Sequence, residues 1–559
     1  MCAEENSSDA VASQPAASIT IYRMMPGRVP FLVGLALLLC ALIFYYLAVL
    51  RIDYAKTALL DLRPYPDAAE YFAQAQAMVH GDPPSIQIGY DKLPSRYPPG
   101  YPALMLPWLK VLRKSNSILA PFRTNQTIGL FLLLAVFTTY CYLAMPLAGG
   151  LATLLLATLP AFFTYCRSSL SEISGSALVA LAFIFVYLGL KDKRRWPIYA
   201  AAVLLGLSLN IRMQLMFFGP LLLAMALFPG KTSRVDWLVN CAAVLLVFAL
   251  AASPIFILNA FQFHNPFKTG YEFWVPVLFE KHLLFSPHYI PGHAAMIWSH
   301  CVLRRTDFNV ANRFGTGTYF VPAYVLLVCG GFGFIRVNRF TICAFLAGST
   351  FLLATASYRF VDGRFYIPIL ILSVAVAILP VEWALRRVMA GPQKLAAFCI
   401  FILFVATCAG YPSQSGYKPR DGRSQAWDAL HVVDPARQSP RFLAQAWLSK
   451  SYGQKPGIVL SDIDPVYLNA LLPKPFVAAP LDEKHHYAFS KLWRYDREDS
   501  IALVRNGLSH SIPIYALFVS MKEMTSASPR LPAIDGYQWT TIDSGNYAVI
   551  LMLTPVMPR

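Results

Sequence analysis

Long apolar segments alternate with short polar ones along the chain as far as residue 411. The apolar segments are about 17–23 residues long, and a helix of that length crosses a hydrocarbon core of about 30 Å. Only helices fit here, because an unpaired backbone group in lipid costs several kcal/mol. The pattern therefore predicts a polytopic α-helical membrane protein with about eleven transmembrane helices, near residues 30–50, 126–146, 148–165, 172–190, 197–211, 213–228, 237–259, 318–335, 339–357, 365–385 and 394–411.

The polar loops between these helices fall into two alternating sets. One set is short and basic, and it comprises residues 191–195, 231–234, 336–339 and 386–394, together with Arg23 and Arg28 before the first helix. The other set contains two long loops, 51–125 and 260–317. Because basic loops stay on the cytoplasmic side, we expect the N-terminus in the cytoplasm. The long loops and everything after residue 411 are then expected on the outer side.

The chain after residue 411 returns to the composition of a soluble domain. Short apolar runs at 457–462, 476–478, 514–519 and 547–553 predict strands, and residues 465–472 predict a short helix. The expected domain organisation is a cytoplasmic N-terminal tail (1–29), a transmembrane domain (30–411) with long outer loops 51–125 and 260–317, and a small extracytoplasmic α/β domain (412–559).

Composition excludes two classes of protein. The 559 residues are 56% hydrophobic and 14% charged, with a mean hydropathy of +0.48, whereas a soluble domain has about 25% charged residues. A formal net charge of +17 would otherwise favour nucleic-acid binding. Much of that charge lies in short loops between apolar segments, where it orients the chain in a membrane. We therefore expect membrane lipids and no nucleic acid among the partners.

The sequence contains no recognisable metal-binding template. The ten cysteines include no CxxC pair, and most lie within predicted helices, where they are expected to be small buried hydrophobic residues. Five histidines in the loop 260–317 match no ligand spacing, and we interpret them as surface or packing residues. They are His264, His282, His288, His293 and His300.

The first long loop carries an acidic segment followed by a proline-rich one. Residues 66–72, Pro-Asp-Ala-Ala-Glu-Tyr-Phe, predict the start of a helix that ends near Gly81. Residues 96–102 predict a stiff, non-helical path, because three of these seven residues are proline. Asp67 can cap the helix, or it can serve as a general base or metal-steering carboxylate at the membrane surface. The two interpretations are compatible.

Charged residues also stand at the outer ends of several predicted helices. Ionisable residues at membrane depth are costly and usually line a site or pathway. Arginines on the outer side also oppose the charge bias that orients a membrane protein. Guanidinium groups bind phosphate oxygens bidentately, so one interpretation is a phosphate site; the other is structural arginines that snorkel to the surface. The residues concerned are Arg167, Glu172, Arg212, Arg359, Asp362 and Arg364.

Taken in chain order, residues 30–411 resemble the GT-C class of membrane glycosyltransferases, and most closely glycosyltransferase family 39. This is the bacterial branch related to protein O-mannosyltransferases and the lipid A aminoarabinose transferase. Residues 66–71 with Gly81 are similar to the acidic motif in the first outer loop of these enzymes, and residues 97–102 are similar to the proline turn that often follows it.

Three further segments strengthen the resemblance, and two positions depart from it. Residues 169–172 resemble the motif that opens the fourth helix of these enzymes, and Arg212 and residues 364–368 resemble later arginine positions. Many members have adjacent Asp-Glu where Ala68 follows the aspartate here, and Gly100 stands in place of a bulky residue. The resemblance implies a GT-C fold with a small outer α/β domain.

The resemblance also implies a function on the outer face of the membrane. Nucleotide sugars are cytoplasmic, so an outward-facing transferase needs a donor that crosses with the membrane, and a polyprenyl-phosphate sugar is such a donor. The expected reaction is inverting transfer of the sugar to an acceptor hydroxyl on a lipid, glycan or protein. The expected location is the bacterial inner membrane, with the C-terminal domain periplasmic or extracellular.

The same resemblance assigns roles to particular residues. Asp67 is expected to act as the catalytic base, and Arg212, Arg359 and Arg364 are expected to hold the donor phosphate. Residues expected to bind or position substrate are Glu70, Tyr71, Arg96, Tyr97, Arg167, Glu172 and Tyr366. Relatives differ in metal dependence, so no cofactor is certain and a divalent cation stays open.

Two other functions fit parts of the sequence. A transporter or flippase of lipid-linked saccharides would use the same arginines, but the sequence has no obvious inverted repeat or pair of broken helices. A catalytically silent scaffold would tolerate substitution of Asp67 and Arg364. Sugar transfer by the purified protein separates the first of these from a transferase.

Overall fold

The structure is a computed structural model that describes residues 28–52, 54, 62, 66–112, 114–226, 233–301, 339–372, 440–481, 495–545 and 548–556. Within these ranges, four helical segments are long and apolar enough to cross a membrane: 30–50, 117–142, 172–192 and 234–263. They belong to helices α1 (Arg28–Tyr45, extended by a π-helical turn to Leu50), α4 (Ala120–Tyr142), α7 (Glu172–Asp192) and α10 (Arg234–Phe263).

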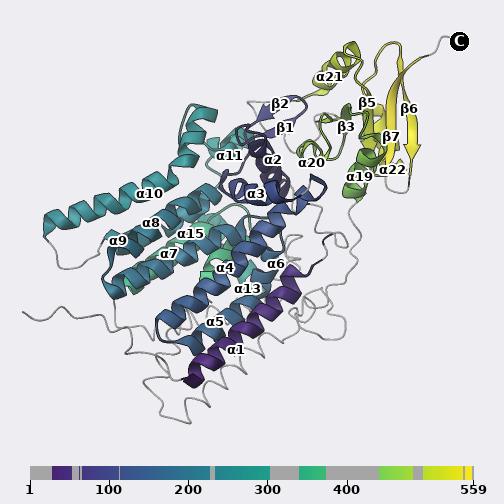
Figure 1. The fold of residues 1–559 in the computed structure, drawn as a ribbon. Coiled ribbons are helices and arrows are strands. Elements are labelled where there is room, and N and C mark those ends of the chain that lie inside the picture. Colours follow the sequence, from purple (N-terminus) through teal and green to yellow (C-terminus); the bar gives the residue numbers. More distant parts are fainter. Residues whose placement is uncertain are drawn as a thin grey trace, which may run out of the picture.

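Shorter apolar helices complete the described part of the bundle, which forms the large helical body in Figure 1. They are α5 (Pro146–Thr158), α6 (Pro160–Cys166), α8 (Arg195–Ile211), α9 (Leu221–Ala226) and α15 (Arg339–Ala356). The helices predicted at 318–335 and 394–411, and most of the one predicted at 365–385, lie outside the described residues.

Two predicted single helices are broken instead. The helix expected at 148–165 is divided into α5 and α6 at Leu159, whose extended backbone (ψ 118°) is what a following proline imposes. The helix expected at 213–228 is a 3-10 helix (Met213–Phe218) followed by α9, with Pro220 between them. Proline in a helix interior removes a hydrogen bond and clashes with the preceding turn, which accounts for both breaks.

Helices α1 and α5 pack so closely that only glycine fits at their contact. A Cβ added to Gly34 would lie 2.2 Å from the Pro146 carbonyl oxygen, and one added to Gly150 would lie 2.3 Å from the Gly34 carbonyl oxygen. Hydrophobic burial does not drive helices together in lipid, so close approach at small residues supplies the van der Waals contact that does.

Asn210, at the end of α8, joins this helix to α10 beside the predicted arginine site. Its amide nitrogen donates to the Ala251 carbonyl (2.9 Å), and its amide oxygen accepts from the Ile255 backbone N–H (2.9 Å). In an unbroken helix these two groups of α10 would pair with each other. Pro254 lies between them, and a neighbouring side chain that takes up the freed groups is what makes proline tolerable in a membrane helix.

The outer loops fold over one end of this bundle. The first loop forms α2 (Asp67–Val79), a two-stranded hairpin of β1 (Ile86–Ile88) and β2 (Asp91–Leu93), and α3 (Gly100–Val111). The second forms α11 (Gly270–Trp274), α12 (Pro276–Glu280) and α13 (Ile290–Cys301). As predicted, α2 ends near Gly81, which has the left-handed backbone conformation (φ 83°) that terminates helices.

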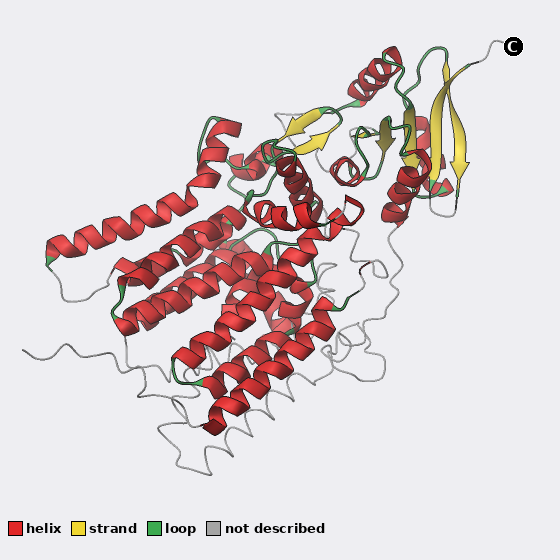
Figure 2. Cartoon of the chain, in the orientation of Figure 1, coloured by secondary structure: helices red, strands yellow, loops and turns green. Residues whose placement is uncertain are grey.

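The C-terminal residues form a mixed sheet with strand order β4-β3-β5-β7-β6. Strands β3, β4 and β5 are parallel, β7 runs antiparallel to β5, and β6 runs antiparallel to β7. The elements are α19 (Pro440–Tyr452), β3 (Ile458–Ser461), α20 (Pro465–Leu471), β4 (Val477–Pro480), α21 (Arg497–Ser509), β5 (Ile514–Phe518), α22 (Met521–Ala527), β6 (Tyr537–Ser544) and β7 (Val549–Pro555). Figure 2 shows the strands gathered at one end of the molecule.

The sheet domain and the first outer loop are joined directly. Helix α20 packs on α2, and the Gly89 N–H of the hairpin donates to the Ala478 carbonyl (2.9 Å). Asn469 adds three bonds: it donates to the Gln87 carbonyl (2.9 Å) and to the Ala478 carbonyl (2.8 Å), and it accepts from the Ala478 N–H (2.7 Å).

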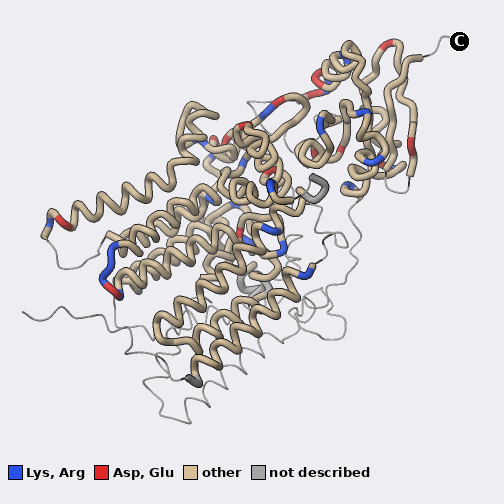
Figure 3. Tube along the Cα trace, viewed as in Figure 1, with Lys and Arg blue, Asp and Glu red and all other residues tan. Residues whose placement is uncertain are grey.

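Charged residues gather at the two ends of the bundle helices (Figure 3). Lys191, Lys193, Arg194 and Arg195 lie where α7 passes into α8, at the ends of these helices away from the C-terminal sheet. The start of α7 and the end of α8, which carry Glu172 and Arg212, lie at the other end. The basic loop and the predicted site therefore lie at opposite ends of the same helices.

Candidate active site

Asp67 is the first residue of α2, but it does not cap that helix. Pro66 is at the N-cap position, and no side chain accepts a hydrogen bond from the first turn. The prediction that Asp67 caps the helix is therefore wrong. Its carboxylate is turned instead toward Tyr97 and Arg364, and the residue is only 9% exposed.

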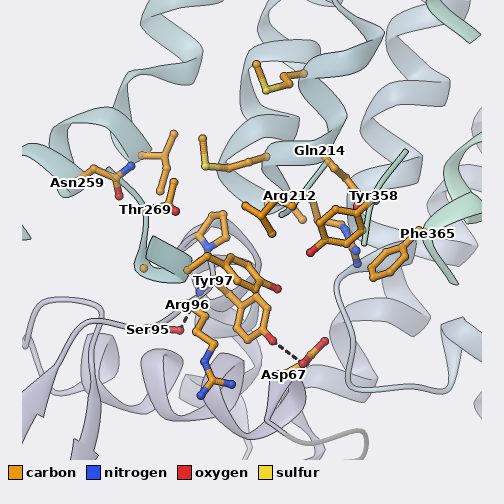
Figure 4. A pocket seen from close by; sticks show the side chains of 18 of the residues that line it. Asp67, Ser95, Arg96, Tyr97, Arg212, Gln214, Asn259, Thr269, Tyr358 and Phe365 are labelled. Carbon is orange, nitrogen blue, oxygen red and sulfur yellow. Dashed lines mark hydrogen bonds between the residues drawn. The ribbon is translucent and has the colours of Figure 1, made fainter. Parts of the chain in front are cut away.

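Tyr97 donates to one carboxylate oxygen of Asp67, at a distance of 2.5 Å between the tyrosine oxygen and Oδ1. Figure 4 shows this bond beside the cavity. Tyr97 stands two residues before Pro99, the N-cap of α3, where the backbone already has helical angles (φ −81°, ψ −6°). Its ring packs on Tyr71 (centroids 4.8 Å apart) and edge-on against Tyr271 (5.4 Å).

Arg364 contacts the other oxygen of Asp67 from a segment 297 positions further along the chain. The distance from Nη1 to Oδ2 is 2.7 Å. Arg364 lies in a 3-10 turn (Gly363–Tyr366), and Asp362 caps the turn by accepting from the Arg364 N–H (2.9 Å). Asp362 Oδ2 also lies 2.9 Å from Arg364 Nε, so the guanidinium is held between two carboxylates.

A second ion pair lies at the ends of α7 and α8. Arg212 Nη1 is 2.6 Å from Glu172 Oε1, and Glu172 is only 1% exposed. Ser171 links this pair to α2, because its hydroxyl contacts Arg212 Nη1 (3.4 Å) and the Tyr71 hydroxyl (2.9 Å). The Phe365 ring lies beside both arginines: its centroid is 5.8 Å from the guanidinium carbon of Arg212 and 5.1 Å from that of Arg364.

Gly100 allows these parts to come together. A Cβ at this position would lie 2.4 Å from the Asn210 carbonyl oxygen, two residues before Arg212. The start of α3 could then not approach the end of α8. The departure from the bulky residue of the related enzymes therefore has a packing reason here.

Glu70 and Arg96 form a pair behind the cavity wall. Glu70 Oε2 accepts from the Ser95 hydroxyl (2.7 Å) and from the Arg96 N–H (2.8 Å), and Arg96 Nε lies 3.6 Å from Glu70 Oε1. Glu70 is fully buried, so it holds the loop before the prolines in place. The Arg96 guanidinium also lies 5.9 Å from the centre of the Trp274 ring.

These groups surround a cavity of about 350 Å³ at the end of the bundle that the two long loops cover. It is lined by predicted site residues from three distant parts of the sequence: Asp67, Tyr71, Arg96, Tyr97, Arg212 and Arg364. Apolar side chains of the 3-10 helix Met213–Phe218, α10 and α12 form much of the remaining wall, among them Met213, Met216, Phe217, Ile255, Leu258 and Phe279.

Burial and charge act in opposite directions on Asp67. Burial favours the neutral acid, but the charge of Arg364 and the Tyr97 hydrogen bond outweigh it, so the pKa of Asp67 lies below its ordinary value. Burial, and then the charge of Asp67, raise the pKa of Tyr97, which keeps this hydroxyl protonated as a donor. Burial raises the pKa of Tyr358, another residue of the cavity wall, to about 12.

Three predicted site residues lie away from this cavity. Arg167 donates to the Ala48 carbonyl (3.3 Å) and lies over the Phe163 ring. The Arg359 side chain is exposed, and only its backbone N–H has a described bond, to the Leu284 carbonyl (2.8 Å). Tyr366 is buried, and its hydroxyl contacts His293 Nδ1 (2.9 Å).

Within the described ranges, no three His, Cys, Asp or Glu side chains are grouped as metal ligands. The charged cluster is built from alternating acids and arginines instead.

Several residues of the cavity were not predicted from the sequence. They include the amides Gln74, Asn259 and Gln262, the hydroxyl of Thr269, and the aromatic residues Tyr271, Tyr358 and Phe365. Asn259 and Gln262 stand three residues apart near the outer end of a long apolar helix, and two amides on one face of such a helix are the signal that could have marked them.

The chain was compared with known proteins. No protein-family model matches it, and no curated protein matches it. Among solved structures, ArnT from Cupriavidus metallidurans bound to undecaprenyl phosphate is similar, with 12% identity, a TM-score of 0.60, and coverage of 93% of this chain and 97% of that chain. The same enzyme in the apo state gives the same values.

An archaeal enzyme is similar as well. The Archaeoglobus fulgidus oligosaccharyltransferase tethered with an acceptor peptide has 12% identity and a TM-score of 0.52, with coverage of 94% of this chain and 74% of that chain. ArnT is a lipid A aminoarabinose transferase, and both enzymes have the GT-C fold. At this level of identity the similarity establishes a fold, and it spans almost the whole chain. The chain is therefore an integral membrane protein with the GT-C fold of membrane glycosyltransferases.

Proposed function

We propose that the chain is an inverting glycosyltransferase that moves a sugar from a polyprenyl-phosphate donor to an acceptor hydroxyl on the outer face of the membrane. One observation carries the proposal: a buried carboxylate and two arginines from segments far apart in the sequence line a single cavity. The fold supports it, because the similar ArnT structure is bound to undecaprenyl phosphate.

The reaction forms one bond and breaks one at the anomeric carbon. The acceptor oxygen attacks this carbon, the bond from the carbon to the phosphate oxygen breaks, and the hydroxyl proton passes to Asp67. The lipid leaves as a phosphate monoester. Its charge becomes more negative during the step, since a diester carries one negative charge and a monoester approaches two at neutral pH.

Arg212 and Arg364 stabilise that added charge. Their ion pairs with Glu172 and Asp67 leave guanidinium N–H groups for phosphate, because a guanidinium has five donors and Arg364 contacts the two carboxylates through Nη1 and Nε. Donors fixed in advance at a developing oxyanion contribute about 3–4 kcal/mol to the barrier when measured by removal. Phe365 lies against both guanidinium groups and holds them apart from bulk water.

Donor binding also makes Asp67 a better base. In the free protein Arg364 and Tyr97 hold the pKa of Asp67 below its ordinary value. Phosphate competes with Asp67 for Arg364, and as that ion pair weakens the carboxylate gains basicity. The acceptor hydroxyl is thus deprotonated only when the donor is in place, which limits wasteful hydrolysis.

The basic loops at the other end of the bundle set the orientation. With 191–195 in the cytoplasm, the cavity and the sheet domain face the periplasm or exterior of a bacterial inner membrane. Sugars activated on nucleotides do not reach that side, whereas a lipid-linked donor does.

Transfer from a labelled donor tests the proposal. Purified protein is incubated with a radiolabelled polyprenyl-phosphate hexose and a membrane extract that supplies acceptors. Label should enter a new product with the wild type and not with Asp67→Asn. Asp82→Asn is the matched control, since Asp82 lies just beyond the same helix and is paired with Lys92 at the surface. Label that crosses vesicles while still attached to its lipid would indicate a transporter instead.

A further inference from the structure

The cavity has two ends of different chemistry. Arg212, Tyr358 and Phe365 lie at one end, with Asp67 close to Tyr97, whereas Asn259 and Thr269 lie on the opposite side (Figure 4). The arginine end suits phosphate. The opposite end is formed by uncharged polar side chains from α10 and the turn before α11, and the proposed reaction above gives it no role.

In three amide side chains of the cavity wall, the nitrogen is the atom that makes the hydrogen bonds to the protein. Gln74 donates from its nitrogen to the Ser95 hydroxyl (2.9 Å) and the Tyr97 carbonyl (3.3 Å). Asn259 donates to the Pro266 carbonyl (3.2 Å), and Gln262 donates to the Pro84 carbonyl (3.0 Å). A carbonyl accepts only from the NH₂ group, so these bonds define which amide atom is oxygen. We call Gln74, Asn259 and Gln262 the amide wall.

The oxygens of the amide wall accept no hydrogen bond from any residue that the structure describes. Gln74 and Asn259 are 1% and 3% exposed, yet both line the cavity. Gln262 is half-buried and also lines the cavity. The amide oxygens of the three residues are therefore fixed acceptors in the cavity wall, and their chemical complement is a ligand that supplies O–H or N–H groups.

The position of α10 explains why these amides reach the cavity. Asn259 and Gln262 follow Pro254, where Asn210 takes up the freed backbone groups of α10. They are three residues apart and share one helix face. Asn210 thus joins the helix that carries Asn259 and Gln262 to α8, whose C-cap residue is Arg212.

We propose, on the basis of the transferase function above, that the amide wall binds the hydroxyl groups of an uncharged sugar on the acceptor. Amide oxygens attract hydroxyl donors and repel phosphate. Tyr97 and Tyr271 stand edge to face beside the wall, and aromatic faces suit the C–H surfaces of a sugar ring. Arg96, a cation of the same cavity lining, is paired with Glu70.

A donor sugar offers the same hydroxyl groups as an acceptor sugar, and kinetics separates the two sources. Full-length protein in lipid nanodiscs is assayed with polyprenyl-phosphate hexose and a synthetic alkyl hexoside as acceptor. We expect Gln262→Met to raise KM for the alkyl hexoside by about tenfold, as loss of a fixed hydrogen bond allows, and to leave KM for the donor within twofold. Gln538→Met, on the exposed face of β6, is the matched control. A rise in donor KM alone would place the donor sugar at the wall and overturn the proposal.

Two comparisons keep this inference distinct from the proposed function. The alkyl hexoside should be a better acceptor than the same compound with a phosphate group, and preference for the phosphorylated form would contradict an uncharged acceptor. Binding of the alkyl hexoside is also followed without turnover, by protection against thermal unfolding. Suppose that the protein transfers no sugar but the alkyl hexoside still protects it, and that Gln262→Met removes this protection. That result would uphold sugar binding at the amide wall and reject the transferase function. Transfer to another acceptor without any such protection would do the reverse.

Discussion

Arg364 is the residue on which the charged cluster depends most. It contacts Asp67 through Nη1 (2.7 Å) and Asp362 through Nε (2.9 Å), and it lies against Phe365. Lysine keeps the charge but has a single nitrogen, so it cannot hold both carboxylates and a phosphate in one plane. We predict that Arg364→Lys lowers kcat by about 10²–10³.

Steady-state transfer measures this loss, and Arg359→Lys is its control. Arg359 is exposed and does not line the cavity, so its replacement by lysine should change kcat by less than about threefold, the effect of a rim charge. An equal loss of kcat in both variants would contradict this account and indicate that Arg359 binds the donor phosphate, as the sequence predicted.

The state of Asp67 predicts the acid limb of the pH profile. A carboxyl group whose pKa is depressed in the folded protein stays ionised until pH falls to that lower pKa. The stability that it contributes above its unfolded pKa is lost as pH falls through the folded pKa. The pKa of Asp67 is depressed. The acid limb of kcat/KM, which reports the free enzyme, should therefore lie below the ordinary carboxyl pKa of about 3.9.

The limb of kcat should lie at higher pH than that of kcat/KM, because kcat reports the donor complex, in which phosphate has weakened the pairing with Arg364. Transfer rates measured from pH 3 to pH 8 give both limbs. A kcat/KM limb near neutral pH would contradict an ion-paired Asp67 in the free enzyme.

At the scale of single residues, sequence reasoning identified the charges but not their partners. It singled out Asp67, Arg212 and Arg364, which the fold brings to one cavity. It considered Asp67 both as a helix cap and as a catalytic base. The cap is a local feature and was wrong, whereas the contact with Arg364 spans 297 positions and could not be predicted. Asn259 and Gln262 were missed because neutral amides in an apolar helix carry no charge signal.

At the scale of elements, α13 holds the turn that carries Arg364. His293 is fully buried between the two ends of the segment 358–366: Nε2 lies 2.8 Å from the Tyr358 carbonyl oxygen, and Nδ1 lies 2.9 Å from the Tyr366 hydroxyl. A neutral ring with its proton on Nε2 satisfies both bonds, and burial lowers the pKa of His293 in agreement. The sequence had assigned this histidine to the surface or to packing, and it is a packing residue with a specific task.

We therefore predict that His293→Ala raises KM for the donor by about tenfold, since the loss of two buried hydrogen bonds loosens the arginine turn. Glutamine can donate and accept as the neutral ring does, so His293→Gln should restore most of the affinity. Donor titrations of both variants and of His288→Ala, an exposed histidine of the same loop, make the comparison. An unchanged KM in His293→Ala would show that the turn holds its shape without this ring.

Hydrophobic patterning predicted where most described helices lie but not where they break. The interruptions at Leu159 and around Pro220 follow local proline effects that a window of average hydropathy conceals. At Pro254 the opposite happens: helix α10 continues, because Asn210 from another helix supplies the missing partners. Whether a proline ends a membrane helix thus depends on a tertiary contact that no local pattern contains.

At the scale of the whole molecule, the sheet domain is attached to the loop that carries Asp67. Asn469 bonds both to the hairpin after α2 and to β4, and α20 packs on α2. We predict that Asn469→Ala weakens this junction by about 1–3 kcal/mol, because it leaves backbone groups of Gln87 and Ala478 without their hydrogen-bond partner. Hydrogen exchange should then rise in residues 67–93.

Asn506→Ala, on the exposed face of α21, is the control for that measurement. Exchange that rises only within the sheet domain would mean that the domain does not support the first outer loop. Sequence reasoning expected an outer domain of strands and helices but could not place it against α2, because the contacts join residues about 380 positions apart.

The central claim is that Asp67 performs the chemistry while the arginines bind the lipid phosphate, and one measurement tests it most directly. Affinity for polyprenyl phosphate and the rate of sugar transfer are determined on the same preparations of wild type and Asp67→Asn. The account predicts that the variant binds the lipid phosphate at least as tightly, because Arg364 loses its competing carboxylate. Transfer should fall by at least about a hundredfold, the usual contribution of a general base. Transfer within a few-fold of the wild type, with binding retained, would contradict the account.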